Sequence, residues 1–162
     1  MIRTILVPLT AELPSEALLD VALSVAKRLN SHIRALFVKP SPETALAYIP
    51  DVIVAAGVTR EVILRETQEA AAASNHHFAD WQRRNNVSEA ADVRLDSCFA
   101  SWSEQFGDIE TVVAHLGRVS DLIVVQPPSS ASVQGQRCFD AAVFESGRPS
   151  RVSSPIGIAA LF

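Results

Sequence analysis

The residues of this 162-residue chain that could hold a charged ligand lie mainly in one serine-rich stretch, Gln126–Arg137, which reads QPPSSASVQGQR. In a small anion nest, backbone N–H groups converge on phosphate oxygens. The residues of the stretch that could form such a nest are Ser129, Ser130, Ser132 and Gly135. Pro127 and Pro128 remove two backbone donors from the same stretch. We therefore expect a solvated loop, with a phosphate-binding loop as the alternative.

The histidines and cysteines form no catalytic or metal-binding pattern. His76 and His77 are neighbours on an expected helix, so they point about 100° apart and cannot both face one metal ion. Cys98 and Cys138 lie far apart without CxxC spacing, which predicts free thiols in a reduced, cytoplasmic protein. The sequence also contains no G-x-S-x-G elbow. We predict no metal site and no catalytic residues, and therefore a protein that is not an enzyme.

Composition excludes two classes of partner. Fourteen Lys and Arg against eighteen Asp and Glu give a net charge of -4, which disfavours binding to nucleic acid or to an anionic membrane. The apolar runs Leu122–Val125 and Ile156–Phe162 are far shorter than the roughly 20 residues that span a bilayer. With 48% hydrophobic residues the chain suits one globular domain. We expect residues 1–154 to form it and residues 155–162 to be an apolar tail or linker.

Strand and helix patterns alternate along the chain. Short aliphatic runs predict buried strands at Arg3–Pro8, His32–Val38 and Asp121–Val125, with Val93–Phe99 as a further candidate. Apolar residues at helical spacing predict helices over about 15–30, 59–86, 109–116 and 135–146. In the first helix we expect Val21 and Val25 on the inward stripe. The alternation predicts a single α/β domain with a parallel sheet.

The same alternation places a candidate site. In open parallel sheets, ligands bind at the carboxyl ends of the strands, where the strand order reverses. The rule selects five positions at the ends of the expected strands, which are Pro8, Thr10, Val38, Gln126 and Ser129. The possible nest adds Ser130 and Gly135. These seven residues form the predicted ligand pocket.

Several segments resemble the universal stress protein family: ILVPL, AKRLN, HIRALFV and above all VVAHLGRVSDLIVV. The sequence ESGRP followed by SPIGIAALF resembles the end of the first half of tandem members, so the chain is either a single-domain relative or half of a tandem protein. The resemblance implies an open five-stranded parallel sheet with helices on both faces, in the adenine-nucleotide-hydrolase-like, Rossmann-like group. It also implies a homodimer, commonly built through the last strand.

ATP-binding members of the family are similar in having an Asp after the first strand and a Gly-x2-Gly-x9-Gly-(Ser/Thr) loop after the fourth. Here Leu9-Thr10 stands at the position of that Asp, and no register of the Gly-x2-Gly-x9-Gly pattern places glycine at all three of its glycine positions. We therefore expect a regulatory or binding domain in stress response, with a degenerate nucleotide pocket and no cofactor. The alternative is a protein that binds ATP or another adenine nucleotide weakly and hydrolyses it slowly through the serine-rich loop.

The expected partners are a second copy of the chain and an unidentified small ligand or protein. The residues PSRVSS after the Gly-Arg turn are too polar for a dry strand-to-strand contact. We therefore expect the dimer interface to include the apolar residues Pro155–Phe162.

Overall fold

The computed structural model describes residues 2–11, 16–41, 59–89, 98–128 and 132–153. Five parallel strands form one sheet in the order β3-β2-β1-β4-β5. The strands are β1 (Thr4–Leu9), β2 (His32–Lys39), β3 (Ala100–Phe106), β4 (Leu122–Val125) and β5 (Ser150–Val152). The helices are α1 (Glu16–Leu29), α4 (Arg60–Asn85), α5 (Ile109–Arg118) and α6 (Val133–Asp140), which continues into the π-helical segment η2 (Ala141–Glu145). The predicted parallel α/β fold is confirmed.

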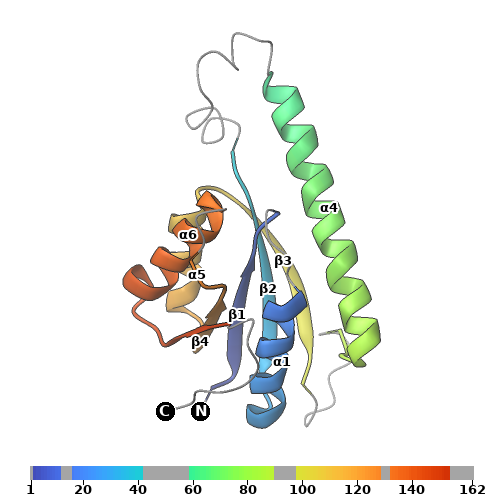
Figure 1. Cartoon of the computed structure of the whole chain (residues 1–162), viewed down its shortest axis with the longest axis vertical. Helices are drawn as coiled ribbons and strands as arrows, with labels where there is room; N and C mark the ends of the chain where they lie inside the picture. The colour runs from blue at the N-terminus through green and yellow to red at the C-terminus, as the bar shows by residue number, and fades with distance from the viewer. Residues whose placement is uncertain (1, 12–15, 42–58, 90–97, 129–131, 154–162) are drawn as a thin grey trace.

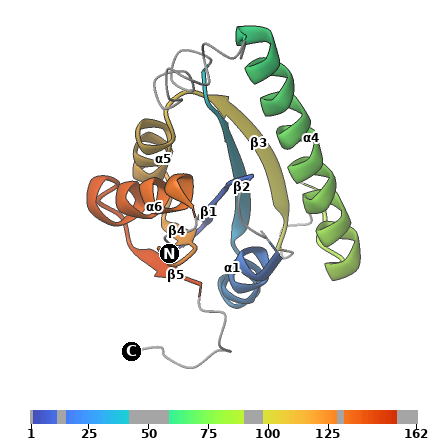
Figure 2. The same ribbon diagram turned by 45° about the horizontal axis from the view of Figure 1, so that its top comes forward.

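Helices cover both faces of the sheet, as Figures 1 and 2 show. Alternate side chains of a strand point to opposite faces, so β1 and β2 supply residues to two separate cores. The core beneath α1 and α4 contains Ile5, Val7, Ala35, Phe37, Phe78 and Trp81. The core beneath α5 and α6 contains Leu6, Leu36, Val38, Val113, Ile123 and Cys138. Strands that are buried on both faces have no polar alternation, which is why β1 and β4 appear as continuous aliphatic runs.

The central strand β1 is fixed to β4 by one carboxylate. Asp121 accepts hydrogen bonds from the backbone N–H groups of Arg3 and Thr4, at 2.8 and 3.0 Å. These bonds lower the pKa of Asp121. They also align the two strands, since Asp121 directly precedes β4, where Leu122 pairs with Ile5.

The first helix has the predicted bounds but a different inward face. The buried residues of α1 are Leu18, Leu19, Ala22, Leu23 and Ala26. Val21 and Val25, which we expected on the inward stripe, are only half-buried and pack against the flank of the core. The physical reason is that α1 packs with the Leu19–Leu23 row toward the sheet, which leaves Leu29 at the end of the helix 39% exposed.

The long helix α4 begins and ends where the sequence predicts. The Thr59 side chain accepts a hydrogen bond from the N–H of Val62, and Asn86 ends the helix in the left-handed conformation. Its 26 residues span about 39 Å, and Figure 1 shows its first turns extending past the sheet. Trp81 packs fully buried at the other end and donates from Nε1 to Asp20 of α1, at 2.8 Å.

The third strand lies later in the chain than predicted. The sequence favoured Val93–Phe99, of which residues 93–97 lie outside the described residues, and the observed strand is Ala100–Phe106. β3 is an edge strand, so its outer residues need not be apolar. Ser101, Ser103 and Gln105 interrupt any aliphatic run, so the sequence pattern did not indicate a strand at Ala100–Phe106.

The last helix starts two residues earlier than predicted, because Ser132 rather than a later residue is its N-cap. The α-helix α6 continues directly as the π-helix η2. After η2, Gly147 adopts a positive φ of 63° and turns the chain toward β5. α5 crosses η2 closely at Gly117, which has no Cβ that would meet Ser146. Within the described part of the chain, no helix is long and apolar enough to cross a membrane.

Candidate functional site

Four of the predicted site positions lie along the carboxyl edge of the sheet. The strand order reverses at β1, which has β2 on one side and β4 on the other. Pro8 and Val38 are buried near the ends of β1 and β2, and Gln126 directly follows β4. Ser129 and Ser130 lie outside the described residues. The topology thus brings four described positions, including Thr10, to one edge, and their role in binding stays a prediction.

Thr10 has an unpaired hydroxyl group at this edge. It follows β1 by one residue, and its Oγ1 is buried without a hydrogen-bond partner among the described residues. An unpaired buried hydroxyl costs about 1–3 kcal/mol. A polar ligand atom at this edge would supply the missing hydrogen bond.

Gly135 lies in the first turn of α6. Its backbone N–H donates to Ser132 Oγ at 2.8 Å, and both residues are buried. This bond is the N-cap of α6 and satisfies one of the donors that open a helix. While the cap is in place, the Gly135 N–H does not face a phosphate.

A three-residue charge cluster joins the start of α5 to the last turn of α6. Arg137 donates from Nη2 to Asp108 Oδ1 at 2.6 Å, and from Nε to Glu110 Oε1 at 2.8 Å. Burial alone would raise the pKa of Asp108, but the hydrogen bonds from Arg137 and from the N–H of Thr111 outweigh it and lower that pKa. One guanidinium faces two carboxylates, so the cluster carries a net charge of -1.

A second ion pair lies where β2 and β3 end. Lys39 Nζ is 2.6 Å from Glu104 Oε2 and 4.4 Å from the centre of the Phe106 ring. Trp102 Nε1 donates to the other oxygen of Glu104 at 2.9 Å. The hydrogen bond from Lys39, followed by that from Trp102, lowers the pKa of Glu104. The Lys39 charge is therefore neutralised within the protein.

Sequence reasoning missed both clusters. Lys39 and Glu104 are 65 positions apart, and Arg137 is 29 positions from Asp108. The only local signal was the expected helix start at Asp108, which the structure confirms as the N-cap of α5.

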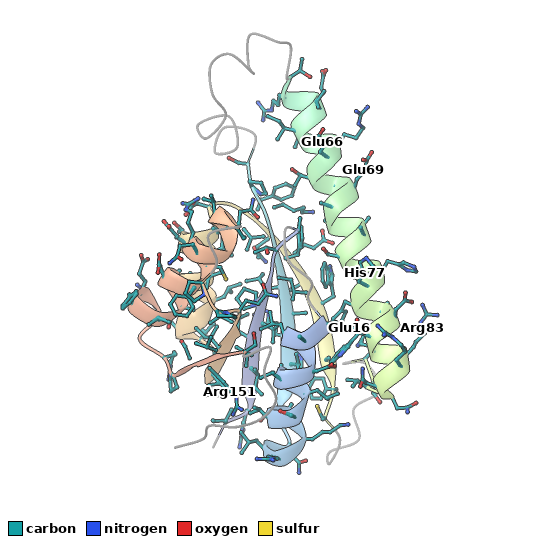
Figure 3. The ribbon with its side chains drawn as sticks, viewed as in Figure 1. Glu16, Glu66, Glu69, His77, Arg83 and Arg151 are labelled. Carbon is teal, nitrogen blue, oxygen red and sulfur yellow. The ribbon has the colours of Figure 1, made fainter. Side chains whose placement is uncertain are left out.

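The histidines and cysteines have structural environments. His32 stacks on Phe99, and burial followed by the charge of Arg34 lowers its pKa. Burial raises the pKa of the Cys138 thiol to about 12. Figure 3 shows His77 on the side of α4 that faces away from the sheet. Across the ranges that the structure describes, no three His, Cys, Asp or Glu side chains group together as metal ligands, and both cysteines are free.

Comparison with known proteins gives a fold. No family model and no curated sequence matches this chain. Universal stress protein UspA from Lactobacillus plantarum matches with a TM-score of 0.64 at 17% identity, over 94% of this chain and 97% of that one. A universal stress protein in complex with cAMP matches with a TM-score of 0.50 at 17% identity, over 94% and 97%. A hypothetical protein solved as a structural-genomics test case gives 0.60 at 10% identity, over 94% and 96%. The chain therefore has the α/β fold of the universal stress proteins.

Proposed function

We propose that this chain is a non-catalytic, universal-stress-like binding or regulatory domain of the cytoplasm, with its ligand at the carboxyl edge of β1 and β4. The observation that carries the proposal is the charge at this edge. Arg137 and Lys39 are each paired with carboxylates, and the two clusters together leave a net charge of -1. The buried, unpaired hydroxyl of Thr10 supports a ligand with a neutral hydrogen-bonding group.

The same charges argue against ATP as the ligand. A triphosphate carries several negative charges and needs cations or clustered backbone N–H groups. Here the carboxylates of Asp108 and Glu110 occupy the guanidinium, and Ser132 occupies the Gly135 N–H. Pro127 has no N–H to offer. We expect ATP to bind with a Kd weaker than about 100 μM, which corresponds to about -5.5 kcal/mol.

Isothermal titration with Mg-ATP tests the proposal. The variant Glu110→Gln removes one carboxylate from the Arg137 cluster and should tighten ATP binding, whereas Glu61→Gln removes the same charge from the exposed start of α4 and should not. Low-micromolar binding by the parent protein would contradict the proposal. Equal ATP affinities of the two variants would show that the cluster does not face the ligand.

A second candidate function is nucleotide binding with weak hydrolysis. It is favoured by one structural neighbour, which was solved in complex with cAMP. A cyclic monophosphate carries fewer charges than ATP, so the net negative edge opposes it less, and the Thr10 hydroxyl could bond its ribose or base. For this function we expect cAMP to bind more tightly than ATP, and Thr10→Val to weaken cAMP binding about tenfold. We also expect the protein to release phosphate slowly from Mg-ATP. A parent protein that neither binds cAMP nor releases phosphate excludes this candidate.

The expected homodimer is part of the proposal as well. Val152 is 42% exposed on β5, and this edge strand has only three residues. So short a strand supports little pairing by itself. The apolar residues 155–162 therefore remain our proposed addition to the interface.

A further inference from the structure

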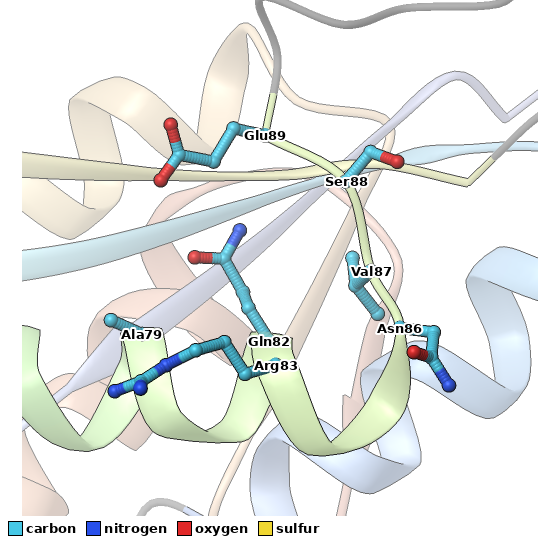
Figure 4. Close-up of a pocket in the computed structure, with 7 residues that line it drawn as sticks. All are labelled: Ala79, Gln82, Arg83, Asn86, Val87, Ser88 and Glu89. Carbon is cyan, nitrogen blue, oxygen red and sulfur yellow. The ribbon is translucent and has the colours of Figure 1, made fainter.

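A groove runs between α4 and the outer edge of β3. It consists of two adjoining hollows of about 510 and 310 Å³, which share Ala79, Gln82 and Glu89. Figure 4 shows the larger hollow, with Gln82 projecting from α4 and Glu89 from the segment that follows the helix. The smaller one adds Phe78, Trp102 and the start of β3. We call this surface the edge groove.

The backbone of β3 alternates between two partners. The bonds from Ile33 N–H to the Phe99 carbonyl (2.9 Å) and from Gly107 N–H to the Lys39 carbonyl (3.0 Å) show that odd-numbered residues pair with β2. Even-numbered residues therefore direct their N–H and C=O groups outward. Along the described chain, these outward groups have no backbone partner at three residues, Trp102, Glu104 and Phe106.

The chain itself shows how this edge is paired. At Ala100, the outward N–H donates to the Ser88 carbonyl at 3.1 Å, and the outward carbonyl accepts from Gln82 Nε2 at 2.9 Å. Ser88 lies beside Phe99 as an isolated parallel bridge. A single residue thus pairs with the outer edge of β3, and the rest of that edge continues in line with it. Unpaired edges of this length are ready templates for another strand.

The side chains that line the edge groove give it an apolar part and a charged part. Phe78 and Trp102 lie 5.6 Å apart between ring centres and give it an apolar floor. Glu89 is exposed and forms no ion pair with any described residue, whereas the other charge in the groove, Arg83, is paired with Asp80. Glu104 further along the edge is neutralised by Lys39. The edge groove therefore has one uncompensated negative charge beside an apolar floor.

We propose that the edge groove binds an extended segment of another protein, which adds a strand to β3 in line with Ser88. Its main chain would bond the outward groups of Trp102, Glu104 and Phe106. Because side chains of a strand alternate, an apolar residue would face the Phe78–Trp102 floor while a Lys or Arg near it reaches Glu89. This interaction is independent of the ligand at the carboxyl edge.

Selection from a displayed library of random dodecapeptides against the full chain tests the proposal. Enriched peptides should alternate apolar and polar residues and contain Lys or Arg. A synthetic copy of one enriched peptide should slow the amide hydrogen exchange of Trp102, Glu104 and Phe106 when it is bound to the protein. Exchange at Ser101 and Ser103 should not change, because their N–H groups are already hydrogen-bonded to β2. A copy N-methylated at alternate amides that face β3 should lose binding.

Two matched variants test the charge. Glu89→Lys should weaken the selected peptide about tenfold, and Glu61→Lys, the same change at the exposed start of α4, should leave its affinity unchanged. The proposal would be overturned if no peptide is enriched, if the two variants bind the peptide equally well, or if the peptide slows amide exchange only in elements other than β3. Enrichment of peptides that protect only the carboxyl edge would likewise overturn it.

Discussion

Replacing Gly117 by alanine should destabilise the protein, although alanine is the better helix former. A Cβ at this position would lie 2.8 Å from Ile123 Cδ1 and 2.8 Å from Ser146 Cβ. The Ile123 methyl could move, but the Ser146 Cβ is attached to the backbone of the segment that packs on α5. Overpacking of this kind costs about 1–3 kcal/mol, and two contacts favour the upper end. The gain in helix propensity returns about 1 kcal/mol. The net loss is then about 2 kcal/mol.

Thermal unfolding followed by circular dichroism measures this loss. About 2 kcal/mol corresponds to a melting temperature about 4–8 °C lower for a chain of this size. The control Arg118→Ala alters the exposed neighbour, which contacts η2 only through one long hydrogen bond to Glu145, and should change little. In the double variant Gly117→Ala/Ile123→Val, one contact is relieved, so its loss should be smaller than the sum of the single losses. An unchanged or higher melting temperature for Gly117→Ala would refute the close crossing of α5 and η2.

Four further outcomes follow from the packing and the charges. Leu23→Asp places an unpaired carboxylate in the core and should prevent folding, whereas Val25→Asp at the half-buried flank should give a folded protein by circular dichroism, and Lys27→Asp should be neutral. The Cys138 thiol, with its pKa raised to about 12, should react with Ellman's reagent at pH 8 only after unfolding, and Cys98, with its pKa also raised by burial, should react slowly. Because the pKa of Asp108 is lowered in the folded protein, its carboxylate stabilises the fold above the unfolded pKa of about 3.9, and this stabilisation is lost as the pH falls through the folded value. The variant Arg137→Gln lacks the main hydrogen bond that lowers this pKa. Between about pH 5 and 2, urea titrations should therefore show a smaller loss of unfolding free energy for Arg137→Gln than for the parent protein. Deleting residues 156–162 should shift a dimer toward monomer in analytical ultracentrifugation, and an unchanged dimer would exclude this segment from the interface.

The parts of the fold that follow local rules were predictable from the sequence. Buried parallel strands are aliphatic throughout, so β1 and β4 were evident, and apolar residues at helical spacing indicated the helix α4 between Thr59 and Asn86. The edge strand β3 was misplaced because one side of it has no partner strand and tolerates polar residues. The inward face of α1 depends on how the helix rotates over β1, which local spacing does not define.

The edge of the sheet that carries the candidate positions was predictable from the sequence, and the ion pairs along it were not. The switch point follows from strand order, and Thr10 was among the predicted positions before its unpaired hydroxyl was seen. The pairing of Lys39 with Glu104 depends on the register of β2 against β3, which brings together residues far apart in the sequence. Gly135 was included as a possible member of an anion nest, and the sequence does not reveal that Ser132 accepts its N–H.

The central place of β1 has a consequence for synthesis on the ribosome. β1 pairs with β2 soon after both have emerged, but its other edge waits for β4. Residues 40–125 take about 4–17 s to add at about 5–20 residues per second. During those seconds the aliphatic strand TILVPL presents one unpaired edge on a half-built sheet. Nascent chains stalled before Leu122 should therefore associate with chaperones, and chains extended past Val125 should be released from them.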